Sequence, residues 1–319
     1  MKLLTNSEMR VWRRCKRRWW LSVYRQLRPV NAHNFNRPLG IGNRVHDCLA
    51  AYYDPDLQED PIEHLWLSAA KDLEKHPDAS DLIEKECNLA DAMLSGYLEW
   101  LAETGEDQGL TVLEAERARS ARLDIPGLDV RLLTKLDARV RHDVYGDDLA
   151  LETKTVTSLN QHLPELRQNT QCLTEHLTQY LSLVEEGKDP EDSRGVLFNM
   201  LKKSKRTARA TPPFYSRVTV RHSKTELRNH WRHVVSIATQ IEDATRRLDA
   251  GEDHHSVVDP NPTGECHWDC EFFRVCTMID DDSDHETALA RFYETGDPLE
   301  RYAGLLEQDE ARRVRSETS

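Results

Sequence analysis

The pattern of apolar and polar positions divides the chain into helical and extended segments. Between residues 60 and 103, apolar residues recur every three or four positions, which predicts two helices separated at His76-Pro77-Asp78. From Thr111 to Thr157 the period changes to two, which predicts three strands in an antiparallel meander. Helices are predicted again at 163–186 and 224–249, with a short apolar strand at 194–201 between them. This order predicts an α/β protein, α+β in local order, with a sheet flanked by helices.

Two neighbouring strands of the meander place charged side chains on one face. Because side chains alternate along a strand, Leu151 points one way while Glu152 and Lys154 point the other. If the turn lies near Tyr145-Gly146, Asp137 falls opposite Lys154 and diagonal to Glu152, with Cβ atoms about 5 to 8 Å apart. An aspartate, a glutamate and a lysine are therefore expected to converge on one point.

This convergence suits phosphodiester hydrolysis. Two carboxylates can hold one or two Mg²⁺ or Mn²⁺ ions, which polarise a phosphoryl oxygen and lower the pKa of a bound water. The ammonium of Lys154 could orient the nucleophile or stabilise the charge that develops on the phosphate. The alternative is an exposed strand face with alternating charge, which is the usual setting of an isolated Glu-x-Lys.

Two basic segments are candidate phosphate contacts. The segment Thr5-Asn6-Ser7-Glu8 has the form of a capping box, and the helix that it starts mixes tryptophans with basic residues that include Arg17 and Arg18. Single-stranded nucleic acid binds such a mixture through phosphate attraction and base stacking, whereas an amphipathic helix would bury the tryptophans and leave the arginines solvated. A loop with Lys202 and Lys203 is the second candidate, with an ordinary solvated loop as the alternative.

The seven cysteines are unevenly spaced, so they do not predict a disulfide framework. Three of them, Cys266, Cys270 and Cys276, cluster in a loop bounded by proline and glycine, which predicts a metal centre. The fourth ligand must come from elsewhere, with Cys15 the best candidate, or from His267. Four thiolates suit a structural Zn²⁺ or an iron–sulfur cluster, and zinc is the more common answer from the residues alone.

Composition limits the protein class. The mean hydropathy is −0.70 and no apolar run approaches the roughly 18 residues of a membrane span, so no membrane association is expected. The start Met1-Lys2-Leu3-Leu4 runs into polar sequence, which predicts no signal peptide and a cytoplasmic location. A net charge of −13 argues against a surface that coats nucleic acid, so DNA contacts must come from local basic patches.

Together these motifs resemble the PD-(D/E)XK nuclease superfamily, specifically its RecB-like branch. The residues that carry the resemblance, in chain order, are Gly42-x-x-x-His46, Asp137, Glu152-x-Lys154 and His176-x-x-x-Tyr180. One cysteine near the N-terminus and three near the C-terminus resemble the iron–sulfur members, which include AddB-type nuclease domains, CRISPR-associated RecB-like exonucleases and phage relatives. The resemblance covers residues 5 to 278. The family's helix motif is commonly Gln-x-x-x-Tyr, and Gln171 is out of register with Tyr180.

The resemblance implies a role for each matched residue. His46, Asp137 and Glu152 would bind Mg²⁺ or Mn²⁺, and Lys154 would be the catalytic lysine. Candidates for DNA binding are Arg17, Arg18, His176, Tyr180, Lys202 and Lys203. The ligands of a structural [4Fe-4S] cluster would be Cys15, Cys266, Cys270 and Cys276, with zinc as the alternative metal.

The resemblance also implies the domain organisation and the activity. Residues 1–278 would form a restriction-endonuclease-like core, a mixed central sheet with flanking helices and a helical insertion at about 55–105. Residues 279–319 would be an acidic appendage. The expected activity is that of a DNA exonuclease acting on single strands or duplex ends in recombination, repair or phage DNA processing, with a recombination or helicase protein as a partner. The alternatives are a zinc-stapled nuclease and a nuclease-fold DNA-binding or adaptor protein without turnover. The oligomeric state stays open.

Overall fold

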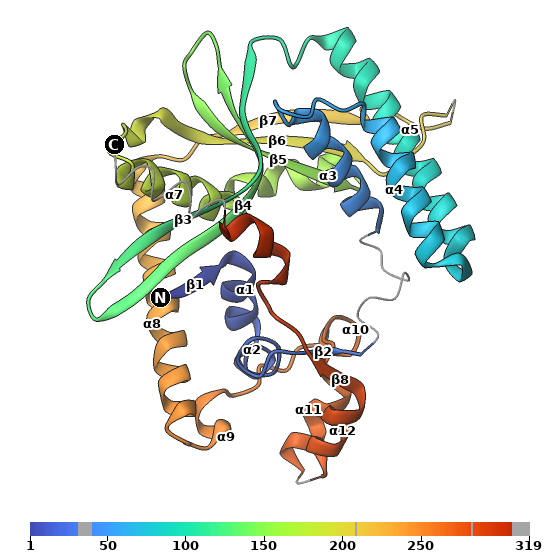
Figure 1. The fold of residues 1–319 in the computed structure, drawn as a ribbon. Helices are drawn as coiled ribbons and strands as arrows, with labels where there is room; N and C mark the ends of the chain where they lie inside the picture. Colours follow the sequence, from blue (N-terminus) through green and yellow to red (C-terminus); the bar gives the residue numbers. More distant parts are fainter. Residues whose placement is uncertain (31–39, 208, 282, 308–319) are drawn as a thin grey trace. The chain divides into compact units, whose positions relative to one another are not determined.

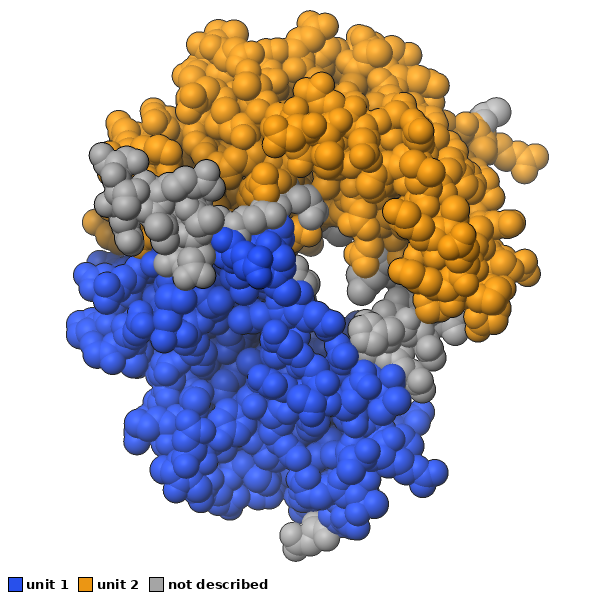
Figure 2. Space-filling view, viewed as in Figure 1, with its two compact units in different colours: residues 1–34, 122–133, 229–307 blue, residues 35–121, 134–228, 308–319 orange. Residues whose placement is uncertain are grey.

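The structure is a computed structural model that describes residues 1–30, 40–207, 209–281 and 283–307. Its contacts divide the chain into two compact units, which Figure 2 colours separately. Unit 1 comprises Met1–Asn34, Arg122–Leu133 and Asn229–Glu307, and unit 2 comprises Phe35–Ala121, Thr134–Arg228 and Gln308–Ser319. The domain boundary expected at residue 278 stays a prediction.

Unit 2 is built on a mixed sheet (Figure 1). Its strands lie in the order β4 (Leu128–His142), β5 (Asp148–Val156), β6 (Ser193–Lys202) and β7 (Tyr215–Val220), and β3 (Leu110–Ile125) pairs with β4. Strands β4 and β5 are antiparallel, β5 and β6 parallel, and β6 and β7 antiparallel. The predicted mixed sheet with flanking helices is therefore confirmed, although β7 was not predicted.

Helices cover both faces of this sheet because apolar side chains alternate along β5. Leu149 and Leu151 pack with buried residues of α3 (Gly40–Tyr53), α4 (Pro61–Lys75) and α5 (Ser80–Thr104). Ala150 belongs to the cluster on the opposite face, with Cys172 of α7 (Thr170–Glu185), Leu159 of α6 (Leu159–His162) and Leu166 of η3 (Leu163–Gln168). Residues of odd and even number in β5 therefore meet different helices.

The helix boundaries follow local capping chemistry. The short η2 (Pro77–Ala79) separates α4 from α5 where the sequence predicted a break, and α8 (Lys224–Asp249) has the predicted bounds. The helix predicted from residue 163 is interrupted, because Asn169 caps a new one. Its side-chain oxygen accepts from the N–H groups of Gln171 and Cys172 at 2.9 and 3.3 Å. As a result, Gln171 lies in the first turn of α7.

The predicted register between β4 and β5 is wrong by two residues. Ala138 lies opposite Leu151, because the turn that joins the strands is centred one residue earlier in the chain than expected. Asp137 therefore comes beside Glu152 instead of opposite Lys154. A shift of two residues leaves every side chain on its original face, so the two carboxylates still meet.

Unit 1 gathers both ends of the chain. Thr5 caps its first helix by accepting from Glu8 N at 3.1 Å, as the capping box predicted. Strand β1 pairs in parallel with residues 130–133 of β4. Strand β2 pairs with β8, which lies in the region 279–319 that was expected to be an appendage. Residues 308–319 of that region lie outside the described part of the chain. No described helix combines the length and the apolarity that crossing a membrane requires.

The other short elements of unit 1 also have defined bounds. In chain order they are β1 (Lys2–Thr5), α1 (Asn6–Arg14), α2 (Lys16–Trp19), η1 (Trp20–Tyr24), β2 (Leu27–Pro29), α9 (His254–Val257), α10 (Cys266–Asp269), α11 (Phe273–Asp280), α12 (His285–Phe292), β8 (Tyr293–Thr295) and η5 (Glu300–Tyr302). In unit 2, η4 (Pro190–Asp192) precedes β6.

Candidate active site

Four residues expected to act together meet within unit 2. Helix α3 supplies His46, β4 supplies Asp137, and β5 supplies Glu152 and Lys154. His46 Nδ1 lies 3.2 Å from Asp137 Oδ2, and the same oxygen accepts from Thr153 N at 2.7 Å. Asp137 is thereby fixed by the backbone of the strand that carries Glu152 and Lys154.

A fifth residue, Gln171 of α7, completes the polar cluster. Lys154 Nζ is hydrogen-bonded to Glu152 Oε1, and it donates to Gln171 Oε1 at 3.1 Å. Gln171 Nε2 donates to Glu152 Oε1 and to Glu175 Oε1, both at 2.8 Å. The sequence analysis did not predict this role for Gln171, because the family's Gln-x-x-x-Tyr spacing, counted back from Tyr180, leads to His176 instead. The capping residue Asn169 is the local signal that places Gln171 at the start of α7.

Burial and neighbouring charge set the protonation of the four predicted residues. Glu152 is 3% exposed, and burial together with the charge of Asp137 raises the pKa of Glu152 to about 7. Burial opposes ionisation of Asp137 too, but the hydrogen bond from His46 keeps the Asp137 pKa below its usual value. Burial alone would lower the pKa of His46 and of Lys154, and the adjacent carboxylates raise both instead. Asp137 is thus the ionised carboxylate of the pair.

The cluster contains a third carboxyl group, the buried Glu175, beside Asp137 and Glu152. Glu175 is 2% exposed, and burial and the charge of Glu152 raise its pKa well above the usual value. Glu175 Oε2 is buried without a hydrogen-bond partner. Carboxylate oxygens are the ligands that Mg²⁺ and Mn²⁺ prefer, and a divalent cation would stabilise the ionised forms of these carboxyl groups. Asp137, Glu152 and His46 are therefore donors of the kind that such an ion binds.

The predicted helix motif lies elsewhere on α7. His176 is buried, with Nε2 3.1 Å from Ser193 O and Nδ1 3.2 Å from His222 Nδ1, and burial lowers its pKa to about 4. Tyr180 is half-buried one turn further along the helix. The structure does not bring either residue into the polar cluster, where Gln171 is found instead.

The basic residues proposed for DNA binding are partly used in structural contacts. Arg17 is 2% exposed and pairs with Asp280, and Arg18 pairs with Glu271 at 2.6 Å. The neighbouring side chains of Trp12, Trp19 and Trp20 are buried, as in the amphipathic alternative. Lys202 Nζ lies 5.6 Å from the centre of the Phe214 ring and donates to Thr211 O, and Lys203 is half-buried.

The four cysteines expected to bind a metal meet in unit 1. Cys15, Cys266, Cys270 and Cys276 line one cavity of about 170 Å³, together with Leu21, Phe272 and Phe273. All four are free thiols. The ends of the chain, separated by more than two hundred residues, thus contribute to one complete set of four thiol ligands.

Hydrogen-bond donors surround the sulfur atoms. Asn261 N lies 3.5 Å from Cys15 Sγ, Thr263 N lies 3.3 Å from Cys266 Sγ, and an Arg17 guanidinium nitrogen lies 3.8 Å from Cys276 Sγ. The N–H of Thr263 lowers the pKa of the Cys266 thiol, whereas burial raises the pKa values of Cys270 and Cys276. Such donors stabilise thiolates, so the cavity fits a metal centre.

Neither candidate metal site has its ligand atoms at coordination distance. Among the described residues, three ligand atoms lie within 4.8 Å of one another only at Asp253, His254 and His255. The four cysteine sulfurs, and the ligand atoms of His46, Asp137 and Glu152, are therefore more widely spaced in this structure than around a single bound ion.

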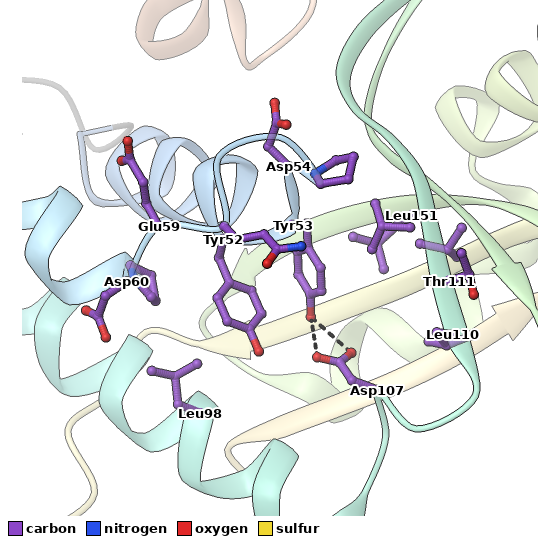
Figure 3. Close-up of a pocket in the computed structure, with 15 residues that line it drawn as sticks. Tyr52, Tyr53, Asp54, Glu59, Asp60, Leu98, Asp107, Leu110, Thr111 and Leu151 are labelled. Carbon is purple, nitrogen blue, oxygen red and sulfur yellow. Dashed lines mark hydrogen bonds between the residues drawn. The ribbon is translucent and has the colours of Figure 1, made fainter.

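A larger cavity in unit 2 lies away from the polar cluster. It encloses about 710 Å³ beside the C-terminal end of α3, and Figure 3 shows Tyr53 hydrogen-bonded to Asp107 in its wall. Leu151 lines it, and Glu152 points to the opposite face of β5. Four of its lining residues are acidic and none is lysine or arginine. Its charge therefore opposes a phosphate backbone.

A family model matches most of the chain. The family model of the PD-(D/E)XK nuclease superfamily matches residues 4–277. No curated protein matches the sequence. A solved structure, described as "Crystal structure of SSO0001", is similar over 74% of this chain and 93% of its own, with 14% sequence identity and a TM-score of 0.28. A likeness with so low a TM-score carries no argument about this chain.

Proposed function

The chain belongs to the PD-(D/E)XK nuclease superfamily, and from this premise we propose that it is a metal-dependent DNA exonuclease with a structural [4Fe-4S] cluster. Membership of the superfamily implies a nuclease that hydrolyses phosphodiester bonds, with DNA as its substrate. The preference for ends, the cluster and a role in recombination, repair or phage DNA processing are the further steps of the proposal. The observation that carries it is the convergence of His46, Asp137, Glu152 and Lys154 from three separate elements.

Each residue of the site has a chemical task in this proposal. Asp137, Glu152 and His46 would hold Mg²⁺ or Mn²⁺, which when bound polarises a phosphoryl oxygen and lowers the pKa of a water ligand. Lys154 has three N–H bonds, and two acceptors engage it among the described residues, Glu152 and Gln171. The third N–H is available for the nucleophile or for a scissile phosphate oxygen, whose negative charge it would stabilise.

The first test is the variant K154A, assayed with labelled linear single-stranded DNA and Mn²⁺. Cleavage should fall by at least about a thousandfold, because the variant lacks the charge that stabilises the transition state. Circular dichroism should show an unchanged fold. The control is K188A, which removes an exposed lysine paired with Glu186 and should cleave at the wild-type rate. Full activity in K154A would refute the assignment, and binding without cleavage by the wild type would favour an adaptor protein.

Preference for ends is tested with the same sequence in two forms. An exonuclease should degrade linear single-stranded DNA and leave a closed single-stranded circle intact. Equal rates on the two forms would identify an endonuclease instead.

The cluster is tested by anaerobic purification, an absorbance spectrum and analysis for iron, sulfide and zinc. The proposal expects a brown protein with iron in excess of zinc, and loss of the colour in C276S. A colourless protein with one zinc would identify the thiol-bound metal as zinc instead of a cluster. The assignment of the nuclease site would not change.

A further inference from the structure

Glu175 lies one helical turn after Gln171 on α7, next to the residues with assigned chemistry. The spacing of four residues puts the two side chains on one face of the helix, and Gln171 Nε2 donates to Glu175 Oε1 at 2.8 Å. Glu175 is 2% exposed, so neither solvent nor a DNA strand reaches it directly. Any effect on the reaction must therefore pass through a neighbour.

That neighbour is Gln171, whose amide group is fully engaged. Its two N–H bonds point to the carboxylates of Glu152 and Glu175, and its oxygen accepts from Lys154 Nζ. A flipped amide would turn its nitrogen toward the Lys154 ammonium and its oxygen toward the Glu152 oxygen that already accepts from Lys154, so both of these contacts would become repulsive. One orientation is thus selected, and Glu175 supplies the acceptor that belongs to neither catalytic side chain.

We propose that Glu175 is a positioning residue, which fixes the amide of Gln171 and through it the place of Lys154 beside Glu152. Lys154 is a long side chain with four rotatable bonds, and its hydrogen bond to Gln171 restricts where the ammonium lies. Gln171 can hold Lys154 only if it is itself held. Glu175 fixes the Gln171 amide independently of Glu152, whose carboxylate is expected to bind the metal ion. The kinetic part of the proposal rests on the proposed nuclease activity.

The test compares E175Q and E175L with the wild type. A glutamine at position 175 still offers an oxygen to Gln171 Nε2, whereas leucine offers no acceptor at similar volume. In E175L, kcat should fall roughly ten- to a hundredfold, the effect of leaving one buried N–H of Gln171 without an acceptor. KM for DNA and the Kd for Mn²⁺, measured by calorimetry, should stay within about twofold. E175Q should retain most of kcat.

T178V is the matched control, since Thr178 is buried on the same helix and its hydroxyl donates only to Thr174 O among the described residues. T178V should leave kcat, KM for DNA and the Kd for Mn²⁺ unchanged. A fall in kcat equal to that of E175L would assign the effect to general damage to α7.

A second readout does not depend on turnover. In ¹⁵N spectra, both amide protons of Gln171, identified by their loss in Q171A, should exchange slowly in the wild type and in E175Q. The Gln171 amide proton that is donated to Glu175 should exchange at least about tenfold faster in E175L. Unchanged exchange in E175L would overturn the proposal, as would loss of Mn²⁺ binding in E175L, which would make Glu175 a metal ligand. An inactive wild type with the expected exchange pattern would refute the nuclease activity and leave the positioning role intact.

Discussion

Replacing Glu152 with glutamine should change how stability depends on pH. In the protein without a divalent ion, burial raises the pKa of Glu152 from 4.5 to about 7. Between these two values the folded protein keeps a proton that the unfolded chain releases. The free energy of unfolding therefore falls as the pH rises through this window.

The expected size of the effect follows from the shift. Each pH unit inside the window changes the free energy of unfolding by about 1.4 kcal/mol, so the full window corresponds to about 3 kcal/mol. In E152Q the side chain no longer titrates, so this loss should disappear. The variant also leaves Lys154 without its partner carboxylate, which changes the free energy of unfolding by the same amount at every pH. The slope, and not the absolute stability, is the quantity that reports on Glu152.

Urea unfolding of both proteins in metal-free buffer, from pH about 5 to pH about 8, measures the slope. The difference in stability between E152Q and the wild type should move by about 3 kcal/mol in favour of E152Q across the range. Saturating Mn²⁺ should flatten the slope of the wild type, because a cation then balances the carboxylate. The control E84Q, at an exposed position of α5, should behave as the wild type. A difference that is constant with pH would refute the reasoning.

Three other variants test unit 2, each by urea unfolding. H176N should resist acid better than the wild type, because burial lowers the pKa of His176 to about 4, so stability is lost as the pH falls from 6.5 toward that value. G195A should lose about 3 kcal/mol or more, since Gly195 has φ 140° and an added Cβ would clash with Val220 O. R217M should lose about 2 to 3 kcal/mol, because Arg217 is buried and pairs with Asp107 at 2.6 Å.

The convergence of Asp137, Glu152 and Lys154 was predictable because it depends on period-two alternation along two neighbouring strands. The register was not predictable. A slip of two residues keeps the same faces buried, so the apolar pattern does not distinguish the two pairings, and only the turn geometry fixes which one forms.

The contribution of α7 was missed for a different reason. A motif spacing pointed to His176 and Tyr180, but which face of a helix meets the sheet depends on where the helix begins. Asn169 starts α7 and thereby turns Gln171 and Glu175 toward Lys154. Strand β7 was missed as well, because its central Ser-Arg-Val-Thr positions give little apolar signal and it follows the Pro212-Pro213 pair.

The ion pairs of unit 1 bear on the stability that the proposed thiol-bound centre would add. The N-terminal segment meets the C-terminal one through ion pairs such as Lys16 with Asp259 and Arg25 with Glu286, whose carboxylates are 67% and 59% exposed. Exposed pairs of this kind contribute at most about 1 kcal/mol each. Arg17 is buried, but its partner Asp280 is half exposed. Ligation of four thiolates contributes on the order of 10 kcal/mol in small metal-bound folds. A metal centre at the four cysteines would therefore join the two ends of the chain far more strongly than these ion pairs do, in addition to the pairing of β2 with β8 and the stacking of Trp20 on His254.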